Sequence, residues 1–291
     1  MEWKGRRSSS NVDDARGSRT MGGSSAGAGM LLSLVGRRFG IKGILVMIVL
    51  GVILWQAGLI DPNQLTGGPA QTTNEPYQAS AEEQELYDFV TVALADTEDV
   101  WTAEFARHNA QYVEPRLVIY TDSYATGCGM GQSAMGPFYC SADRKVYIDL
   151  GFYDELEQSF DAPGDFAQAY VIAHEIGHHV QNLLGTSGKV QAMQGRPDYN
   201  EYSVRLELQA DYYAGVWARH NQQYLDKGDI EEAMRAANAI GDDAIQGKRG
   251  KVVPEAFTHG TSEQRMRWFN KGFESGRIED GDTFSMPYSE L

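Results

Sequence analysis

The chain has 291 residues, enough for one catalytic domain of about 200 residues and an additional segment. Its formal net charge is −15, but residues 1–42 hold eight Lys or Arg against three Asp or Glu, whereas the rest holds 17 against 37. A domain this acidic excludes nucleic-acid binding through a general electrostatic surface, and the uneven charge predicts a basic tail beside an acidic domain.

The first 60 residues are expected to form a tail and a membrane anchor. Residues 1–40 are rich in Gly, Ser and Arg and cannot bury much apolar surface, so we predict a disordered basic tail. Within residues 41–60, the run Gly43–Ile60 has 18 residues and no charge. Eighteen residues is close to the shortest length of a transmembrane helix, so this run predicts that the chain is anchored in a lipid bilayer.

The charges around this run predict its orientation. Basic residues lie just before it and Asp61 follows it, so the positive-inside rule places the N-terminus in the cytoplasm and the remainder outside; the basic residues are Arg37, Arg38 and Lys42. A cleaved signal peptide is the competing interpretation, but its charged region would be unusually long. Residues 61–79, with several Pro, Gly and Gln, are expected to be a linker to a domain over residues 80–291.

The first part of this domain contains one predicted helix, two predicted strands and the two cysteines of the chain. An S-x-x-E pattern at Ser80 indicates a helix start, and strands are expected at Leu117–Tyr120 and, half-buried, at Lys145–Leu150. Cys128 and Cys140 flank a turn-rich segment. Outside the cytoplasm, such a pair predicts a disulfide, with zinc ligation by both thiolates as the alternative.

A helix predicted from Asp165, as its N-cap, to Leu184 carries the sequence H-E-x-x-H. His174 and His178 lie one turn apart on one face, so both imidazoles can reach one metal ion. Glu175 is rotated by about 100° from His174 and can lie beside a metal-bound water without being a ligand. Apolar residues cover most of this helix, so its polar side chains need partners.

A catalytic zinc site requires a third protein ligand. Glu207, on the next predicted helix from Ser203 to Tyr224, is the best candidate. Asp211 follows one turn later on the same face, where it can accept the second ring N–H of a ligand histidine and fix its tautomer. An exposed acidic stripe is the alternative for this pair, but the apolar neighbours of both residues disfavour it.

Taken together, these motifs resemble those of the gluzincins and, more closely, of the bacterial membrane-anchored "putative neutral zinc metallopeptidase" family. The motifs shared with that family are the anchor, the Gly136–Cys140 and Val146–Leu150 segments, the H-E-x-x-H helix and the final His-Gly-Thr-Ser-Glu-Gln-Arg at residues 259–265. The resemblance implies a zincin-like α+β domain, mainly helical with a small sheet and preceded by a single transmembrane helix.

This resemblance also implies a bacterial inner-membrane protein with a periplasmic domain, and one Zn²⁺ per chain bound by His174, His178 and Glu207. Glu175 would be the general base of peptide hydrolysis, acting on peptide or protein substrates. His259 is the first candidate for an oxyanion donor, with Tyr212 or Tyr213 next; a structural histidine at a helix N-terminus is the alternative for His259. The functional alternative is a non-catalytic envelope factor for binding or assembly.

Peptide substrates of zincins commonly add as a strand to an exposed sheet edge. Two segments are candidates for that edge, the strand Val146–Leu150 and the segment Gly131–Cys140. The sequence leaves the choice between them open. Either segment would have to be unpaired on one side and lie close to the zinc ligands.

Overall fold

The computed structural model describes residues 1–17, 77–248 and 250–291. The predicted anchor at residues 41–60 lies outside these ranges, as does most of the predicted linker over residues 61–79. Among the residues that are described, no helix has both the length and the apolar character that a membrane span requires.

The first residues of the chain are part of the folded domain. Met1–Arg16 and Tyr77–Leu291 form one compact unit, and β1 (Val12–Asp14) pairs in parallel with β2 (Arg116–Tyr120). The prediction of a disordered tail over residues 1–40 is therefore wrong for residues 1–16, and residues 18–40 lie outside the described part. The composition argument failed because these residues need no core of their own; they bind to the surface of one.

The described strands form one mixed sheet and one hairpin. The sheet has the order β1-β2-β6-β5, in which β5 (Phe138–Cys140) runs antiparallel to β6 (Lys145–Asp149) and the other neighbours are parallel. The hairpin consists of β3 (Ser123–Thr126) and β4 (Gly129–Gln132). Both predicted strands are present, as β2 and β6.

The strand β6 lies inside the sheet and is covered on both faces. Tyr147 was expected on an exposed face, but it is only 2% exposed because Tyr124 of the hairpin and Phe138 of β5 pack against its ring. With β6 between β2 and β5, the described edges of the sheet are β1 and β5.

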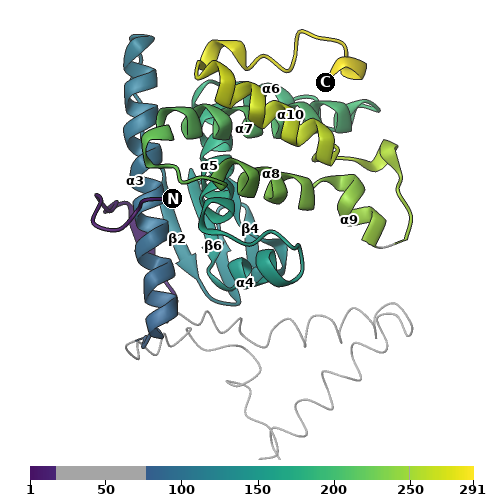
Figure 1. The fold of residues 1–291 in the computed structure, drawn as a ribbon. Helices are drawn as coiled ribbons and strands as arrows, with labels where there is room; N and C mark the ends of the chain where they lie inside the picture. Colours follow the sequence, from purple (N-terminus) through teal and green to yellow (C-terminus); the bar gives the residue numbers. More distant parts are fainter. Residues whose placement is uncertain (18–76, 249) are drawn as a thin grey trace, which may run out of the picture. The chain divides into compact units, whose positions relative to one another are not determined.

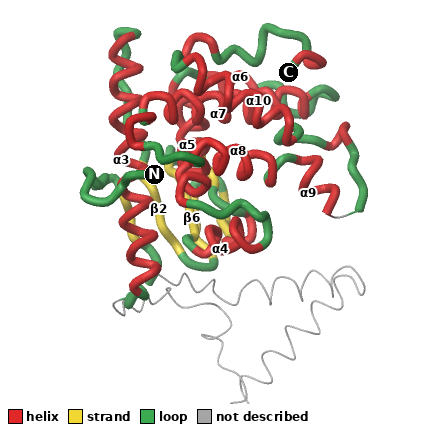
Figure 2. Tube along the Cα trace, in the orientation of Figure 1, coloured by secondary structure: helices red, strands yellow, loops and turns green. Residues whose placement is uncertain are grey.

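Helices form the larger part of the described domain (Figure 2), so the fold is a mainly helical α+β fold with a small mixed sheet. Short 3₁₀ turns connect several of them. The helices are α3 (Ala81–Arg107), α4 (Gly151–Gln158), α5 (Asp165–Leu183), α6 (Thr186–Gln191), α7 (Tyr199–His220), α8 (Asp229–Ala239), α9 (Asp242–Lys248) and α10 (Ser262–Ser275).

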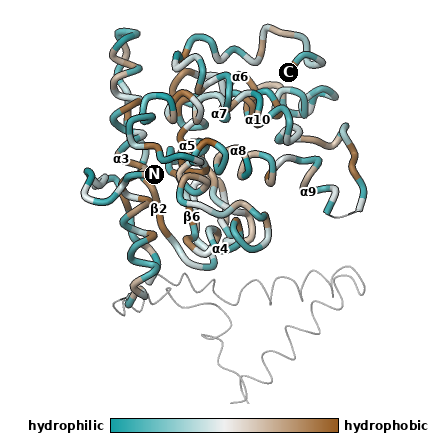
Figure 3. Tube along the Cα trace, in the orientation of Figure 1, coloured by the Kyte–Doolittle hydropathy of each residue, from teal (hydrophilic) through white to brown (hydrophobic). Residues whose placement is uncertain are grey.

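The helix α5 lies in the middle of the domain, between the sheet with α3 on one side and α7, α8 and α10 on the other (Figure 1). Hydrophobic residues are concentrated along α5 and the inner strands (Figure 3). At its start, the ring of Phe166 stacks on that of Trp217 with 5.5 Å between centroids. The predicted N-cap is wrong by one residue: Gly164 is the N-cap, and the carboxylate of Asp165 accepts a hydrogen bond from the Met1 amino group instead.

The helices α7 and α10 pack closely against each other. A Cβ atom at Gly272 would overlap the backbone of Tyr212, so glycine is required for this approach. Thr261 and Gln264 form a reciprocal capping box at the start of α10. The helix α7 begins at Tyr199, one turn earlier than predicted. This packing brings the first turn of α10 next to the residues that α5 and α7 present to each other.

Candidate metal centre

Three predicted ligands meet where α5 faces α7. The distance from Nε2 of His174 to Oε2 of Glu207 is 3.2 Å, and from Nε2 of His178 to Oε1 of Glu207 it is 3.5 Å. One ligand atom from each of the three side chains lies within 4.8 Å of the others. The structure therefore brings together the two imidazoles and the carboxylate that were predicted from the sequence to bind one metal ion.

A close approach of the two helices makes this meeting possible. Gly177 lies between the two histidines, and a Cβ atom there would be 2.9 Å from the carbonyl oxygen of Ala210 on α7. Any side chain at this position would push the helices apart. The glycine inside the H-E-x-x-H motif is thus needed to bring Glu207 within reach of both imidazoles.

His174 is held by a charged network. Its Nδ1 lies 2.8 Å from Oδ1 of Asp211, which is fully buried. Arg265 of α10 donates to both carboxylate oxygens of Asp211, at 2.9 and 3.0 Å. The hydroxyl of Tyr170 donates to the same carboxylate at 2.5 Å. The predicted contact of Asp211 with a ligand histidine is present, and it leaves Nε2 of His174 facing Glu207.

His178 is held by neutral groups. Its Nδ1 lies 2.9 Å from Oε1 of Gln181, a fully buried amide one turn further along α5. The amide nitrogen of Gln181 donates to the carbonyl of Leu206 at 2.7 Å and to Oε1 of Gln209 at 3.2 Å. Because that nitrogen has two acceptors, Oε1 must be the atom that faces the imidazole. His178 therefore carries its proton on Nδ1, and its Nε2 is free to bind a metal.

The metal-ligand group opens onto a cleft of about 640 Å³. Glu175 lies in the same cleft and is 9% exposed, but it does not belong to the group of three ligand atoms. This is the placement predicted for a general base. The apolar walls of the cleft come from α4, α5, the segment before β5 and the region of α9. They include Met135, Pro137, Phe152, Phe160, Val171, Ile240 and Ile245.

His259 lines this cleft as well. Its Nδ1 lies 3.3 Å from Oδ1 of Asp242, and Asp242 also accepts backbone N–H bonds from Thr258, His259 and Gly260. The two tyrosines that competed with it as oxyanion donors are directed elsewhere. The hydroxyl of Tyr212 donates to the carbonyl of Arg277, and Tyr213 lines a separate cavity.

The charges around the ligand group shift the pKa values of its members in opposite directions. Burial opposes protonation of His174, but Asp211 raises the pKa of that imidazole to about 9. Burial also opposes ionisation of Glu207, yet the imidazoles of His178 and His174 hold the pKa of its carboxyl well below the usual range. Burial raises the pKa of Glu175. The site thus contains one anionic ligand and one carboxyl group suited to taking up a proton.

Comparison with known proteins agrees with this geometry. Residues 1–284 match the family described as "Putative neutral zinc metallopeptidase". The Escherichia coli protein named "Uncharacterized protein YpfJ" is 47% identical over 290 residues, 98% of this chain and 99% of its own. The chain belongs to this family.

Two further observations concern the relatives. The Mycobacterium tuberculosis protein named "Uncharacterized protein Rv2575" is 43% identical over 188 residues, which cover 60% of this chain and 64% of that protein. No solved structure matches the chain. The family description names zinc, and the ligand group fits that ion: two imidazole nitrogens and one carboxylate are a donor set of catalytic zinc sites, and the second nitrogen of each imidazole is already engaged.

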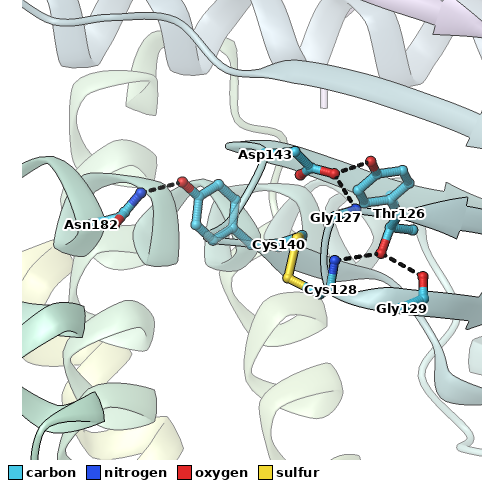
Figure 4. The surroundings of a disulfide bond; sticks show 9 residues. Thr126, Gly127, Cys128, Gly129, Cys140, Asp143 and Asn182 are labelled. Atoms are coloured by element: carbon cyan, nitrogen blue, oxygen red, sulfur yellow. Dashed lines mark hydrogen bonds between the residues drawn. A yellow bond between two sulfur atoms is a disulfide. The ribbon is translucent and has the colours of Figure 1, made fainter.

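The cysteines of this family member form the predicted disulfide. Cys128 and Cys140 are bonded, which excludes the alternative of zinc ligation by two thiolates (Figure 4). The bond joins the tip of the β3–β4 hairpin to the end of β5. Beside it, the hydroxyl of Tyr139 accepts a hydrogen bond from Asn182 of α5, so the edge strand is fixed to the helix that carries the metal ligands.

Sequence reasoning missed four residues of the site. Tyr170 and Gln181 lie one turn before His174 and one turn after His178, so helical spacing could have found both. Asp242 and Arg265 are 30 or more residues from the ligands, and only the packing of α9 and α10 brings them in. The local sequence does not distinguish Asp242 from a surface charge, and the motif at residues 259–265 includes Arg265 without indicating its contact with Asp211.

Proposed function

We propose that the protein is a zinc-dependent peptidase that hydrolyses peptide bonds in its cleft, with one zinc ion held by His174, His178 and Glu207. The observation that carries this proposal is Glu175: a buried carboxyl group with a raised pKa, beside the ligand group but not part of it. A purely structural metal site has no need of such a group.

The mechanism follows from the positions of these side chains. Zinc, when bound, lowers the pKa of a coordinated water toward about 7 and polarises a carbonyl group. Glu175 takes a proton from the attacking water and passes it to the leaving amine, for which its raised pKa is suited. His259, protonated and oriented by Asp242, donates a hydrogen bond to the oxygen that becomes negative during attack.

The strand β5 is the proposed binding edge for the peptide. It pairs with β6 on one side, and the described sheet has no further strand on its other side. Phe138 and Tyr139 line the cleft together with the ligands. The alternative edge at Val146–Leu150 is excluded because β6 is paired on both sides. A substrate would lie extended along β5, with its side chains against the apolar walls.

The decisive experiment compares the full-length protein with its Glu175→Gln variant. We expect both to contain one zinc ion per chain by elemental analysis, and only the wild type to generate new peptide termini in a proteome-derived peptide library. Equal cleavage profiles for the two proteins, with zinc retained in both, would refute the peptidase and favour the non-catalytic envelope factor.

We also propose that the domain works outside the cytoplasm. The Cys128–Cys140 disulfide supports this placement, since disulfides persist in oxidising compartments and are rare in the cytosol. The apolar residues 43–60 support attachment to a bacterial membrane.

A further inference from the structure

The first 16 residues run across the outer side of the domain, and we call residues 1–16 the N-terminal strap. In its second half, β1 adds a parallel strand to β2, with Val12 opposite Leu117 and Asp14 opposite Ile119. In its first half, Trp3 packs edge-on against Phe89 of α3, with 5.6 Å between ring centroids. The strap therefore adds the outermost strand beside β2 and covers part of α3.

The surface beneath the strap carries acidic side chains that only the strap neutralises among the described contacts. Asp96 of α3 is 5% exposed in its side chain and forms an ion pair with Arg6 at 2.5 Å. Glu98 is 3% exposed in its side chain; it pairs with Arg7 at 2.9 Å and accepts hydrogen bonds from Ser9 and Asn11.

These ion pairs make the surface specific for the strap. A buried carboxylate is costly unless it has charged or hydrogen-bonding partners. Here the strap both buries the carboxylates and supplies those partners. The pairs follow the same order in both segments, with Arg6 on Asp96 and Arg7 on Glu98. Binding by an unrelated basic segment would not reproduce this register together with the β1–β2 pairing.

The C-terminal end of the strap is also held by ion pairs. Arg16 is 6% exposed; it pairs with Asp14 of the strap and with Glu83 of α3. Asp13 pairs in turn with Arg116 of β2 and with Lys145 of β6. The family match also begins at residue 1, so it includes the strap together with the domain.

From these contacts we propose that the strap and the domain at residues 77–291 lie on the same side of any membrane to which the chain is attached. Hydrogen bonds and ion pairs of about 3 Å cannot form across a hydrocarbon layer about 30 Å thick. A single crossing between residues 17 and 76 would separate the two. The proposal therefore replaces the expected topology of a cytoplasmic N-terminus and an extracytoplasmic domain, and it does not depend on peptidase activity.

The test uses full-length proteins with one introduced cysteine, expressed in a Gram-negative bacterium whose outer membrane is permeabilised. Ser10→Cys reports on the strap and Thr102→Cys on the domain; both positions are exposed. A membrane-impermeant maleimide is added to intact and to lysed cells. The parent chain, whose two cysteines are disulfide-bonded, is the control for background labelling.

We expect Ser10→Cys and Thr102→Cys to be labelled to the same extent in intact cells. Labelling of one in intact cells and of the other only after lysis would overturn the proposal. If both react only after lysis, the proposal stands, and the extracytoplasmic placement of the domain fails instead. The two ideas are therefore separated by one experiment.

A second pair of variants tests whether the strap is bound in the cell. Ala15 directly follows β1 and is buried, with 7% of its surface exposed, whereas Ser10 is exposed. In detergent-free membranes we expect Ala15→Cys to react at least tenfold more slowly than Ser10→Cys, and equally fast in SDS. Equal rates without SDS would mean an unbound strap and would overturn the proposal.

Discussion

The two imidazoles of α5 are one turn apart and belong to the same candidate metal-ligand group, but different kinds of hydrogen-bond partner hold them. His174 contacts Asp211, whose charge is balanced by Arg265. His178 contacts Gln181, a neutral amide fixed by a backbone carbonyl and by Gln209. Both arrangements fix the tautomer and direct Nε2 toward Glu207.

The two contacts differ in how much unfolding free energy is lost when the partner of the histidine is removed. Removing Asp211 leaves the guanidinium of Arg265 buried without its ion-pair partner, and buried unpaired charges are expensive. Removing the amide of Gln181 leaves only neutral groups without partners, at the cost of a lost hydrogen bond. The charged support should therefore be tied to the stability of the whole domain, and the neutral one mainly to the metal site.

The largest effect is expected for Asp211→Ala. The variant should lose about 3–5 kcal/mol of unfolding free energy, because Arg265 remains buried without a counter-charge. Zinc affinity should fall by about 10–100-fold as His174 loses its orienting partner. Urea denaturation of the metal-free protein and competition with a chelator measure the two effects. Asp211→Asn keeps the shape and one acceptor oxygen but also removes the charge, so it should lose nearly as much stability; a loss of only about 1 kcal/mol in Asp211→Asn would contradict the role of charge.

A smaller loss of stability is expected for Gln181→Leu. About 1–3 kcal/mol should be lost, as His178 Nδ1–H is left buried without an acceptor, while zinc affinity falls by about 10–100-fold as in Asp211→Ala. The same denaturation and competition measurements apply, and Gln191→Leu, at an exposed glutamine of α6, is the matched control. If Gln181→Leu destabilises the domain as much as Asp211→Ala, the distinction between charged and neutral support is wrong.

The contrast also shows how far sequence reasoning reached. The spacing of His174, His178, Glu207 and Asp211 identified both helices and their facing sides, because helical periodicity converts sequence distance into geometry. Gln181 obeys the same periodicity but belongs to a residue type that carries no metal or acid–base chemistry. Arg265 is placed by the packing of α10 on α7, which depends on close contacts such as that of Gly272 with Tyr212.

The N-terminal strap shows a different limit. Its Gly, Ser and Arg content predicts that it forms no core of its own, yet Arg6 and Arg7 become ordered through carboxylates about 90 residues away. Composition describes what a segment can do alone. It does not report complementary charges on a surface that exists only after folding.

The smallest effect on stability is expected at a third imidazole, which extends the comparison to a half-exposed histidine. His259 contacts Asp242 as His174 contacts Asp211, but its side chain is 52% exposed. The hydrogen bond that the imidazole of His259 donates to Asp242 raises the pKa of His259. If protonated His259 is the oxyanion donor, peptidase activity is lost as the pH rises through that raised pKa.

Asp242→Asn removes the charge that stabilises the imidazolium, so the alkaline limb of kcat/KM should move to lower pH while activity at low pH persists. The pH profile of kcat/KM on one peptide substrate measures this shift, and His259→Ala should lack the limb and lose about 10²–10³-fold in activity. An alkaline limb that stays in place in Asp242→Asn would assign that titration to another group. Asn at position 242 keeps an acceptor oxygen for the backbone N–H groups of Thr258, His259 and Gly260, and the imidazole that loses its counter-charge is half-exposed, so this replacement should cost far less stability than that of Asp211.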